Sequence, residues 1–174
     1  MKIKTFVTFL IIIFSSSAFA TNIKVLDFQK IIDNNTNLSK LYELINKDQE
    51  MHKEIFKNEE LNLKNELDEI EKLNLILDAS ELEKEIENYN NKLNNFNKKI
   101  EKFNLHYDFQ INNLKNKIIN VILEELKEYS ENNSVDLVLD STNYILSSNS
   151  INITNIIEDQ VNKKKIEINF EKYK

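Results

Sequence analysis

The stretch LEKEIENYNNKLNNFNKKIEKFNLHY, residues 82–107, decides the fold of this chain. Its apolar and aromatic residues follow one another at alternating steps of four and three, which gives a repeat of 3.5 residues. Such a repeat is typical of a helix that winds left-handedly around a partner helix. The residues on this stripe are Leu82, Ile86, Tyr89, Leu93, Phe96, Ile100, Phe103 and Tyr107.

The stripe continues beyond residue 107, but its spacing changes. A second consecutive step of four, from Tyr107 to Ile111, makes a stutter that locally unwinds a supercoil. Further apolar residues then carry the stripe to residue 129, at Leu114, Ile118, Ile122, Leu126 and Tyr129. The sequence therefore predicts one long helix that has a packed side along its whole length.

The partner helix is predicted immediately upstream. Apolar residues between 38 and 77 can share one side of a helix: Leu38, Leu41, Ile45, Met51, Ile55, Leu63, Leu67, Ile70, Leu73 and Leu77. The two helices divide near residues 78–80, where Ser80 followed by Glu83 fits a capping box. Helices joined by so short a turn run antiparallel. Residues 38–130 are therefore predicted to form a helical-hairpin arm.

Short strand-like segments flank the arm on both sides. Residues 23–26 and 135–140 are β-branched and apolar, and residues 144–146 read as a hairpin partner of the second segment. Asp27 is placed to cap a short helix over 28–33, and Asn152 to cap a last helix that carries Val161. The fold class is therefore mainly α with a small β body, in which the arm is inserted between the strands.

The predicted organisation has four parts. Residues 1–20 are a signal peptide, residues 21–37 and 131–165 form a small α/β body, residues 38–130 form the arm, and residues 166–174 are a tail. The tail alternates apolar and polar residues, which leaves open whether it is an extra strand or a loose end.

The first twenty residues have the three parts of a secretory signal peptide. Lys2 and Lys4 provide the positive start, residues 6–14 the apolar run, and Ala18-Phe19-Ala20 the cleavage site. The apolar run is shorter than the roughly 20 residues that a membrane-spanning helix needs. The mature chain is therefore expected to be exported and to begin at Thr21.

The charge of the expected mature chain argues against nucleic-acid binding. Of the 23 basic residues, all lysines, two leave with the signal peptide, so 21 lysines face 29 acidic residues and the net charge is −8. An acidic chain repels phosphate backbones. The sequence also lacks Cys, Gly and Pro, so an exported form has no disulfides to stabilise it.

No catalytic or metal-binding constellation is apparent in the sequence. His52 and His106 are the only histidines, and neither has a Cys or a second His at metal-ligand spacing. The chain has no glycine-rich loop and no nucleophile elbow. We therefore expect no enzyme activity, no cofactor and no metal.

The small body predicts association of several copies. About three short strands and two short helices bury little surface, and small sheets need partners. Closing the strands of several subunits against one another would also hide their edges. The residues expected to assemble the body strands are Ile23, Val25, Leu26, Val135, Leu137, Val138, Leu139, Tyr144, Ile145 and Leu146.

The chain resembles the Skp/OmpH family of periplasmic chaperones. The resemblance rests on residues 23–27 (IKVLD), 135–140 (VDLVLD), 144–148 (YILSS) and the closing helix that opens at Asn152-Ile153-Thr154. Between these segments, the arm is similar to the family's arm in length and heptad pattern. The match covers nearly all of 22–164.

The resemblance implies a homotrimer shaped like a jellyfish, in which strands build a central body and three arms enclose a cavity. It implies a holdase that binds unfolded outer-membrane proteins without nucleotide and prevents their aggregation. The acidic charge argues against the lipopolysaccharide site of basic family members, and a peripheral membrane contact stays open. The alternative function is an exported structural coiled-coil protein of the cell envelope.

Residues for contact with a client protein are sought among apolar side chains that fall off the packed stripes. Phe56, Leu75 and Phe109 meet this criterion. Apolar residues on the outside of a projecting arm are candidates for binding a partner.

Overall fold

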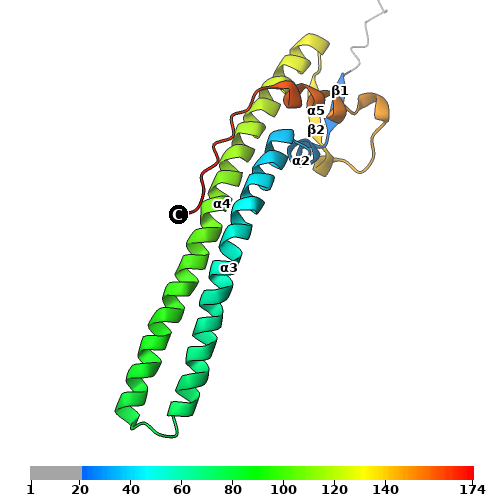
Figure 1. Ribbon diagram of the computed structural model, residues 1–174. Coiled ribbons are helices and arrows are strands. Elements are labelled where there is room, and N and C mark those ends of the chain that lie inside the picture. The colour runs from blue at the N-terminus through cyan, green and yellow to red at the C-terminus, as the bar shows by residue number, and fades with distance from the viewer. Residues whose placement is uncertain (1–20) are drawn as a thin grey trace, which may run out of the picture.

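A computed structural model describes residues 21–174, so the predicted signal peptide lies outside the described residues. The chain forms a long helical hairpin on a small body (Figure 1). In chain order the elements are β1 (Ile23–Leu26), α2 (Phe28–Asp33), α3 (Thr36–Leu73), α4 (Ala79–Asn133), β2 (Leu137–Asp140), the 3-10 turns η1 (Ser141–Asn143) and η2 (Asn149–Ile151), and α5 (Thr154–Lys163). The predicted fold class is confirmed.

The body is built around two strands from opposite ends of the chain. β1 and β2 pair in parallel, with Ile23 opposite Leu137 and Leu26 opposite Asp140. Parallel strands need a long crossover connection, and here the entire hairpin of α3 and α4 provides it. On the other side of β1, the N–H of Ile153 donates to the carbonyl of Val25 at 2.8 Å.

The predicted hairpin between residues 135–140 and 144–146 is wrong for the single chain. The strand begins at Leu137, and η1 directly after it turns the chain out of the sheet. Asp140 stabilises this turn, since its side chain accepts from the Thr142 N–H and also from the Phe28 N–H at 2.9 Å. The hydrogen bond from Phe28, followed by that from the Thr142 hydroxyl, holds the pKa of Asp140 below its usual value. Residues 144–146 are left without a strand partner within residues 21–174.

Polar side chains at the starts of the helices accept from the first backbone N–H groups, which have no partner within the helix. Asp27 accepts from the Lys30 N–H at the start of α2, as predicted. Asn152 accepts from the Thr154 N–H at the start of α5, one residue before the N-cap position. The predicted capping box at Ser80 is wrong: the N-cap lies two residues earlier, at Asp78, which accepts from the N–H groups of Ser80 and Glu81, both at 2.9 Å. The negative charge of the Asp78 carboxylate also interacts favourably with the positive end of the α4 helix dipole.

The packed side of α3 differs from the predicted stripe in its middle. Leu38, Leu41, Ile45, Leu63 and Ile70 are buried as expected. Met51 and Ile55 are instead about half exposed, at 50% and 53%. Their places on the packed side are taken by Asp48, His52 and Phe56. This set continues the spacing of three and four from Ile45 to Phe56, and Leu63 follows two helical turns later.

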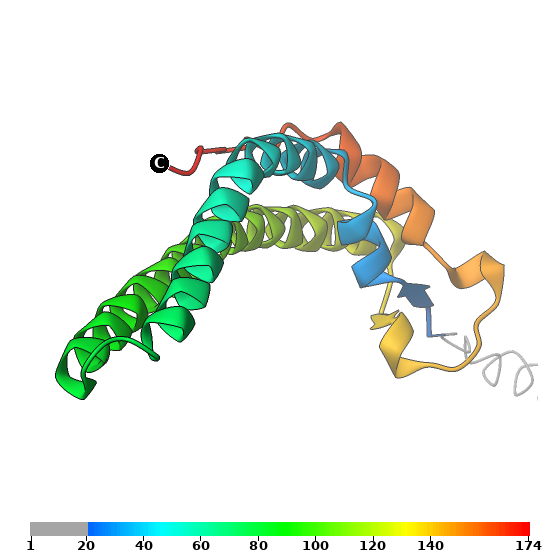
Figure 2. The ribbon, with the colours of Figure 1, turned by 60° about the horizontal axis from the view of Figure 1, so that its bottom comes forward.

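The core lies where the hairpin joins the body. Its buried apolar side chains come from β1, α2, the first turns of α3, the second half of α4, α5 and the tail (Leu26, Ile31, Ile32, Leu38, Leu41, Ile45, Phe103, Tyr107, Leu114, Ile118, Ile122, Ile153, Ile157, Val161 and Ile166). Away from this junction the arm consists of two helices alone. Figure 2 shows both helices bending together along their length. Within residues 21–174, no helix is apolar enough over a sufficient length to cross a membrane.

Candidate functional site

The centre of the arm contains a cluster of aromatic side chains between α3 and α4. Phe56 of α3 packs edge-on against Phe103 of α4 with 4.9 Å between ring centroids, and His52 packs against the same ring at 5.4 Å. Tyr107 lies 5.1 Å from Phe103 on its other side. Edge-to-face pairs of this kind add to the stability gained from burial. The cluster joins the two helices at the point where the body's core ends.

A buried carboxylate lies next to this cluster. Asp48 is 2% exposed, and its Oδ2 accepts from the Tyr107 hydroxyl at 2.6 Å and from the Tyr173 N–H at 3.0 Å. Burial works to raise the pKa of Asp48, but these two hydrogen bonds and the nearby His52 outweigh burial and keep the pKa below its usual value. Burial and the same carboxylate raise the pKa of Tyr107. Asp48 is therefore an ionised group that binds the C-terminal tail.

Sequence reasoning missed Asp48 and the neighbouring Gln110, because both are polar residues on packed sides. The spacing contains the signal that would have found them. Asp48 follows Ile45 by three residues, and Gln110 lies three after Tyr107 and four before Leu114. If the packed side is traced by the spacing of three and four alone, without regard to residue type, it includes both residues.

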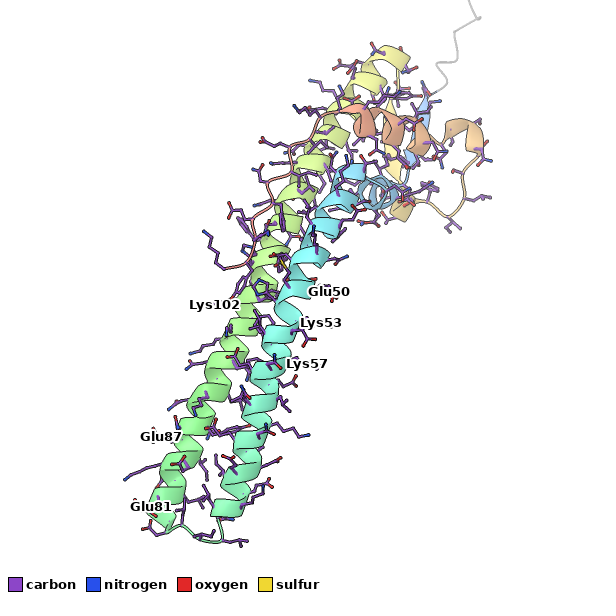
Figure 3. All side chains as sticks on the ribbon, in the orientation of Figure 1. Glu50, Lys53, Lys57, Glu81, Glu87 and Lys102 are labelled. Carbon is purple, nitrogen blue, oxygen red and sulfur yellow. The ribbon has the colours of Figure 1, made fainter. Side chains whose placement is uncertain are left out.

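The outer surface of the arm is polar, with charges of both signs. Figure 3 shows Glu50, Lys53 and Lys57 on α3, and Glu81 and Glu87 near the start of α4. Two ion pairs connect the helices across the seam, Lys92 with Glu66 and Lys99 with Glu59, both at 2.6 Å. They are partly exposed, so each contributes at most about 1 kcal/mol. Exposed apolar side chains lie among these charges.

The predicted client-contact residues lie in different environments. Leu75, in the turn at the end of the arm, is 89% exposed, and Phe109, on α4, is 67% exposed. Phe56 is half-buried in the aromatic cluster and does not lie off the packed side. The prediction that Phe56 points outward is wrong. The reason is the same as for Met51 and Ile55: the packed side of α3 has a different register from the predicted one.

The predicted assembly residues also divide into two groups. Val25 and Leu26 are buried inside the chain itself, and Val135, Val138, Leu139 and Tyr144 are half-buried. Ile23 and Leu137 lie opposite each other on the paired strands and are partly exposed. Ile145 and Leu146 are fully or almost fully exposed. Ile23, Leu137, Ile145 and Leu146 are thus available to another molecule.

No group of three or more acidic or histidine side chains within residues 21–174 is placed to hold a metal ion. The cluster around Asp48 is built from hydrogen bonds that join helices to the tail.

Comparison with known proteins agrees with this architecture. The family model described as outer membrane protein (OmpH-like) matches residues 22–161. A crystal structure of a candidate outer membrane chaperone (OmpH-like) from Caulobacter crescentus superposes with a TM-score of 0.65 at 10% sequence identity. That match covers 89% of this chain and 92% of the Caulobacter chain. No curated protein matches the sequence.

Proposed function

Because the chain belongs to the OmpH-like family, we propose that it is a periplasmic holdase that binds unfolded outer-membrane proteins without nucleotide and prevents their aggregation. The observation that carries this proposal is the arm: two long helices project from a small body and present scattered apolar side chains between charged ones. Many weak contacts of this kind hold an extended chain without trapping it, since no single contact is strong. The family's activity is that of a chaperone and involves no catalysed reaction.

The exposed apolar residues follow the arm from the body to its tip. Those with an exposed fraction of 40% or more on the two long helices and their turn are Leu44, Met51, Ile55, Leu61, Leu75, Ile76, Ile86, Leu105, Phe109 and Leu123. We propose Leu75 and Phe109 as client contacts at two different levels of the arm. Phe56 lies in the aromatic cluster between the helices, so we assign it to stability of the arm.

Charge on the arm is uneven, and this bears on the class of client. Residues 59–92 contain eleven acidic residues and four lysines, a net charge of −7, which is nearly all of the −8 of residues 21–174. A tip of this charge repels anionic surfaces and attracts basic segments, over a distance of about 8 Å at physiological ionic strength. The proposal therefore includes basic stretches of clients, and the same charge argues against a lipopolysaccharide site.

The proposal includes assembly into a homotrimer through the body. The two-stranded sheet is smaller than an independently stable sheet, and Ile145 and Leu146 are exposed beside it. A second and a third copy would cover these side chains and place three arms around one cavity.

The test is suppression of aggregation by residues 21–174. A urea-unfolded outer-membrane β-barrel protein is diluted into buffer with and without the purified chain, and light scattering is followed in the absence of nucleotide. We expect scattering to fall to near zero when trimer and client are equimolar. Unchanged scattering with a folded, assembled chain would reject the holdase and favour a structural coiled-coil role.

A matched pair of variants tests the contact residues. Leu75→Ser with Phe109→Ser should require several-fold more protein for the same suppression. Asn94→Ser with Asn104→Ser changes two exposed polar positions on α4 and should have no effect. Equal suppression by both double variants, with unchanged helicity, would show that Leu75 and Phe109 are not client contacts.

A further inference from the structure

The C-terminal tail, residues 166–174, lies against the hairpin although it forms no helix or strand. After α5 it runs back along α4 towards the arm (Figures 1 and 2). It lies beyond the residues that match the family model, which end at 161. Ile166 is buried, and Ile168, Phe170 and Tyr173 pack on the core, whereas Glu167, Asn169 and Glu171 are exposed.

The hydrogen bonds of the tail show that its backbone is extended. The carbonyl of Glu167 accepts from Lys117 Nζ at 3.2 Å, and four residues later Glu171 bonds to Gln110. Seven residues of α4 separate these two partners, which is roughly 10 Å along a helix. Four tail residues span that distance readily in a strand-like conformation, which rises about 3.3 Å per residue.

Gln110 pairs with the main chain of Glu171 as a neighbouring strand would. Its Oε1 accepts from the Glu171 N–H at 2.8 Å, and its Nε2 donates to the Glu171 carbonyl at 3.0 Å. The Nε2 of His106 also lies 2.8 Å from this carbonyl. One side-chain amide thus satisfies both polar groups of one extended residue.

The hydrogen bonds that hold the tail are almost all made to its main chain. Asp48 adds a bond to the Tyr173 N–H. Of the bonds that join the tail to α3 and α4 within the described residues, only that from the Tyr173 hydroxyl to the Lys99 carbonyl uses a tail side chain. Main-chain bonds combined with pockets for alternate side chains are the usual way to bind an extended peptide of varied sequence.

The surface on which the tail lies extends beyond the tail itself. A groove of about 680 Å³ runs beside it, with one wall formed by Glu167, Asn169 and Glu171 and the other by α4. The side chains of Leu105 and Phe109 line the α4 wall and are more than half exposed. The groove therefore has apolar surface that the tail does not cover.

We propose that the surface under the tail, together with this adjoining groove, is a binding site for extended client segments in which apolar and polar residues alternate, and that the tail is the built-in occupant of that surface. The tail sequence IEINFEKYK has this alternation from Ile166 to Glu171, and transmembrane β-strands have it too. A client segment displaces the tail, takes over its bonds to Gln110 and Asp48, and is released when the tail returns. This inference rests on the proposed holdase function and names one site through which it works.

The first experiment measures binding of a fluorescein-labelled IEINFEKYK peptide by anisotropy. The native chain is compared with Ile168→Ser/Phe170→Ser, which weakens docking of the resident tail, and with a second variant that ends at Lys165. A tethered tail competes at an effective concentration on the order of millimolar. We therefore expect both variants to bind the peptide about tenfold or more tightly than the native chain.

Two controls identify the site and the pattern that it reads. Adding Gln110→Ala to either variant should lower peptide affinity about tenfold, whereas adding Asn94→Ala, at an exposed position on the same helix, should leave it unchanged. A peptide of the same composition with its four apolar residues consecutive should bind at least tenfold more weakly. Equal binding of the two peptides would overturn the inference.

Light scattering with the native chain separates this inference from the proposed function. If the native chain suppresses aggregation but neither folded variant binds the peptide, the inferred binding site is rejected and the holdase function is retained. Gln110-dependent peptide binding without suppression would support the groove and reject the holdase. If Ile168→Ser/Phe170→Ser lowers the assembled mass without any gain in peptide binding, the tail of one copy docks on another copy. This result would overturn the inference.

Discussion

Asp48 is a charged residue on a side of α3 that is otherwise apolar and aromatic, and its environment explains why the helix tolerates it. An unpaired buried carboxylate is costly, but two donors satisfy this one. One donor belongs to α4 and the other to the tail. Asp48 therefore couples three segments that are far apart in sequence, and the next two predictions concern this coupling.

Removing the hydroxyl of Tyr107 should destabilise the chain. A hydrogen bond to a charged group contributes about 1.5–3 kcal/mol, so Tyr107→Phe should lower the free energy of unfolding by about that amount. Tyr89→Phe is the matched control, since the Tyr89 hydroxyl has no hydrogen-bond partner within residues 21–174. Urea unfolding at one protein concentration measures both. Equal midpoints would show that Tyr107 contributes packing alone.

Acid should remove the stability that Asp48 provides. Its pKa is lower in the folded chain than in the unfolded one, so its contribution is fully present above the unfolded value of about 4 and is lost as the pH falls through the lower folded value. The urea midpoints of the native chain and Asp48→Asn should therefore differ at neutral pH and converge below about pH 4. A difference that stays constant down to about pH 3 would contradict this.

At the scale of the elements, the turn between α3 and α4 depends on one cap. Asp78 accepts from two N–H groups of α4, and within residues 21–174 no other side chain accepts from these two groups. Asp78→Ala should cost about 1 kcal/mol and should fray the first turn of α4, which hydrogen exchange of the amides near residues 80–84 detects. Ser80→Ala should leave exchange unchanged. The reverse result would restore the capping box that the sequence predicted.

At the scale of the whole molecule, the chain has exposed apolar surface at both ends, and the two ends should behave differently. Ile145→Ser with Leu146→Ser removes apolar surface beside the small sheet and should lower the assembled mass measured by light scattering with size-exclusion chromatography. Burying side chains of this size is worth about 1.5–3 kcal/mol each. Leu75→Ser with Ile76→Ser removes a similar area at the tip of the arm and should leave the mass unchanged. An unchanged mass in the first variant would reject assembly through this part of the body.

Sequence alone determined the helices, the two strands that flank the arm and the order of these elements. The repeat of 3.5 residues in 82–107 predicted a paired helix, the strand-like segments on both sides of the arm predicted the body, and Asp27 was correctly read as a cap. These signals are local: spacing and side-chain type within one segment are enough to define an amphipathic helix or to pair a carboxylate with a nearby N–H group.

Tertiary structure decided which partner each element takes. Apolar residues on α3 fall on more than one stripe, so only contact with α4 selects Asp48, His52 and Phe56 over Met51 and Ile55. β2 pairs with β1 and not with residues 144–146, because Asp140 turns the chain towards α2. The tail depends on Gln110 and Asp48, whose partners lie 61 and 125 residues away. Each of these pairings forms because its free energy is lower than that of the alternative pairing. The segments that pair are far apart in sequence, so the pattern within one segment does not reveal its partner.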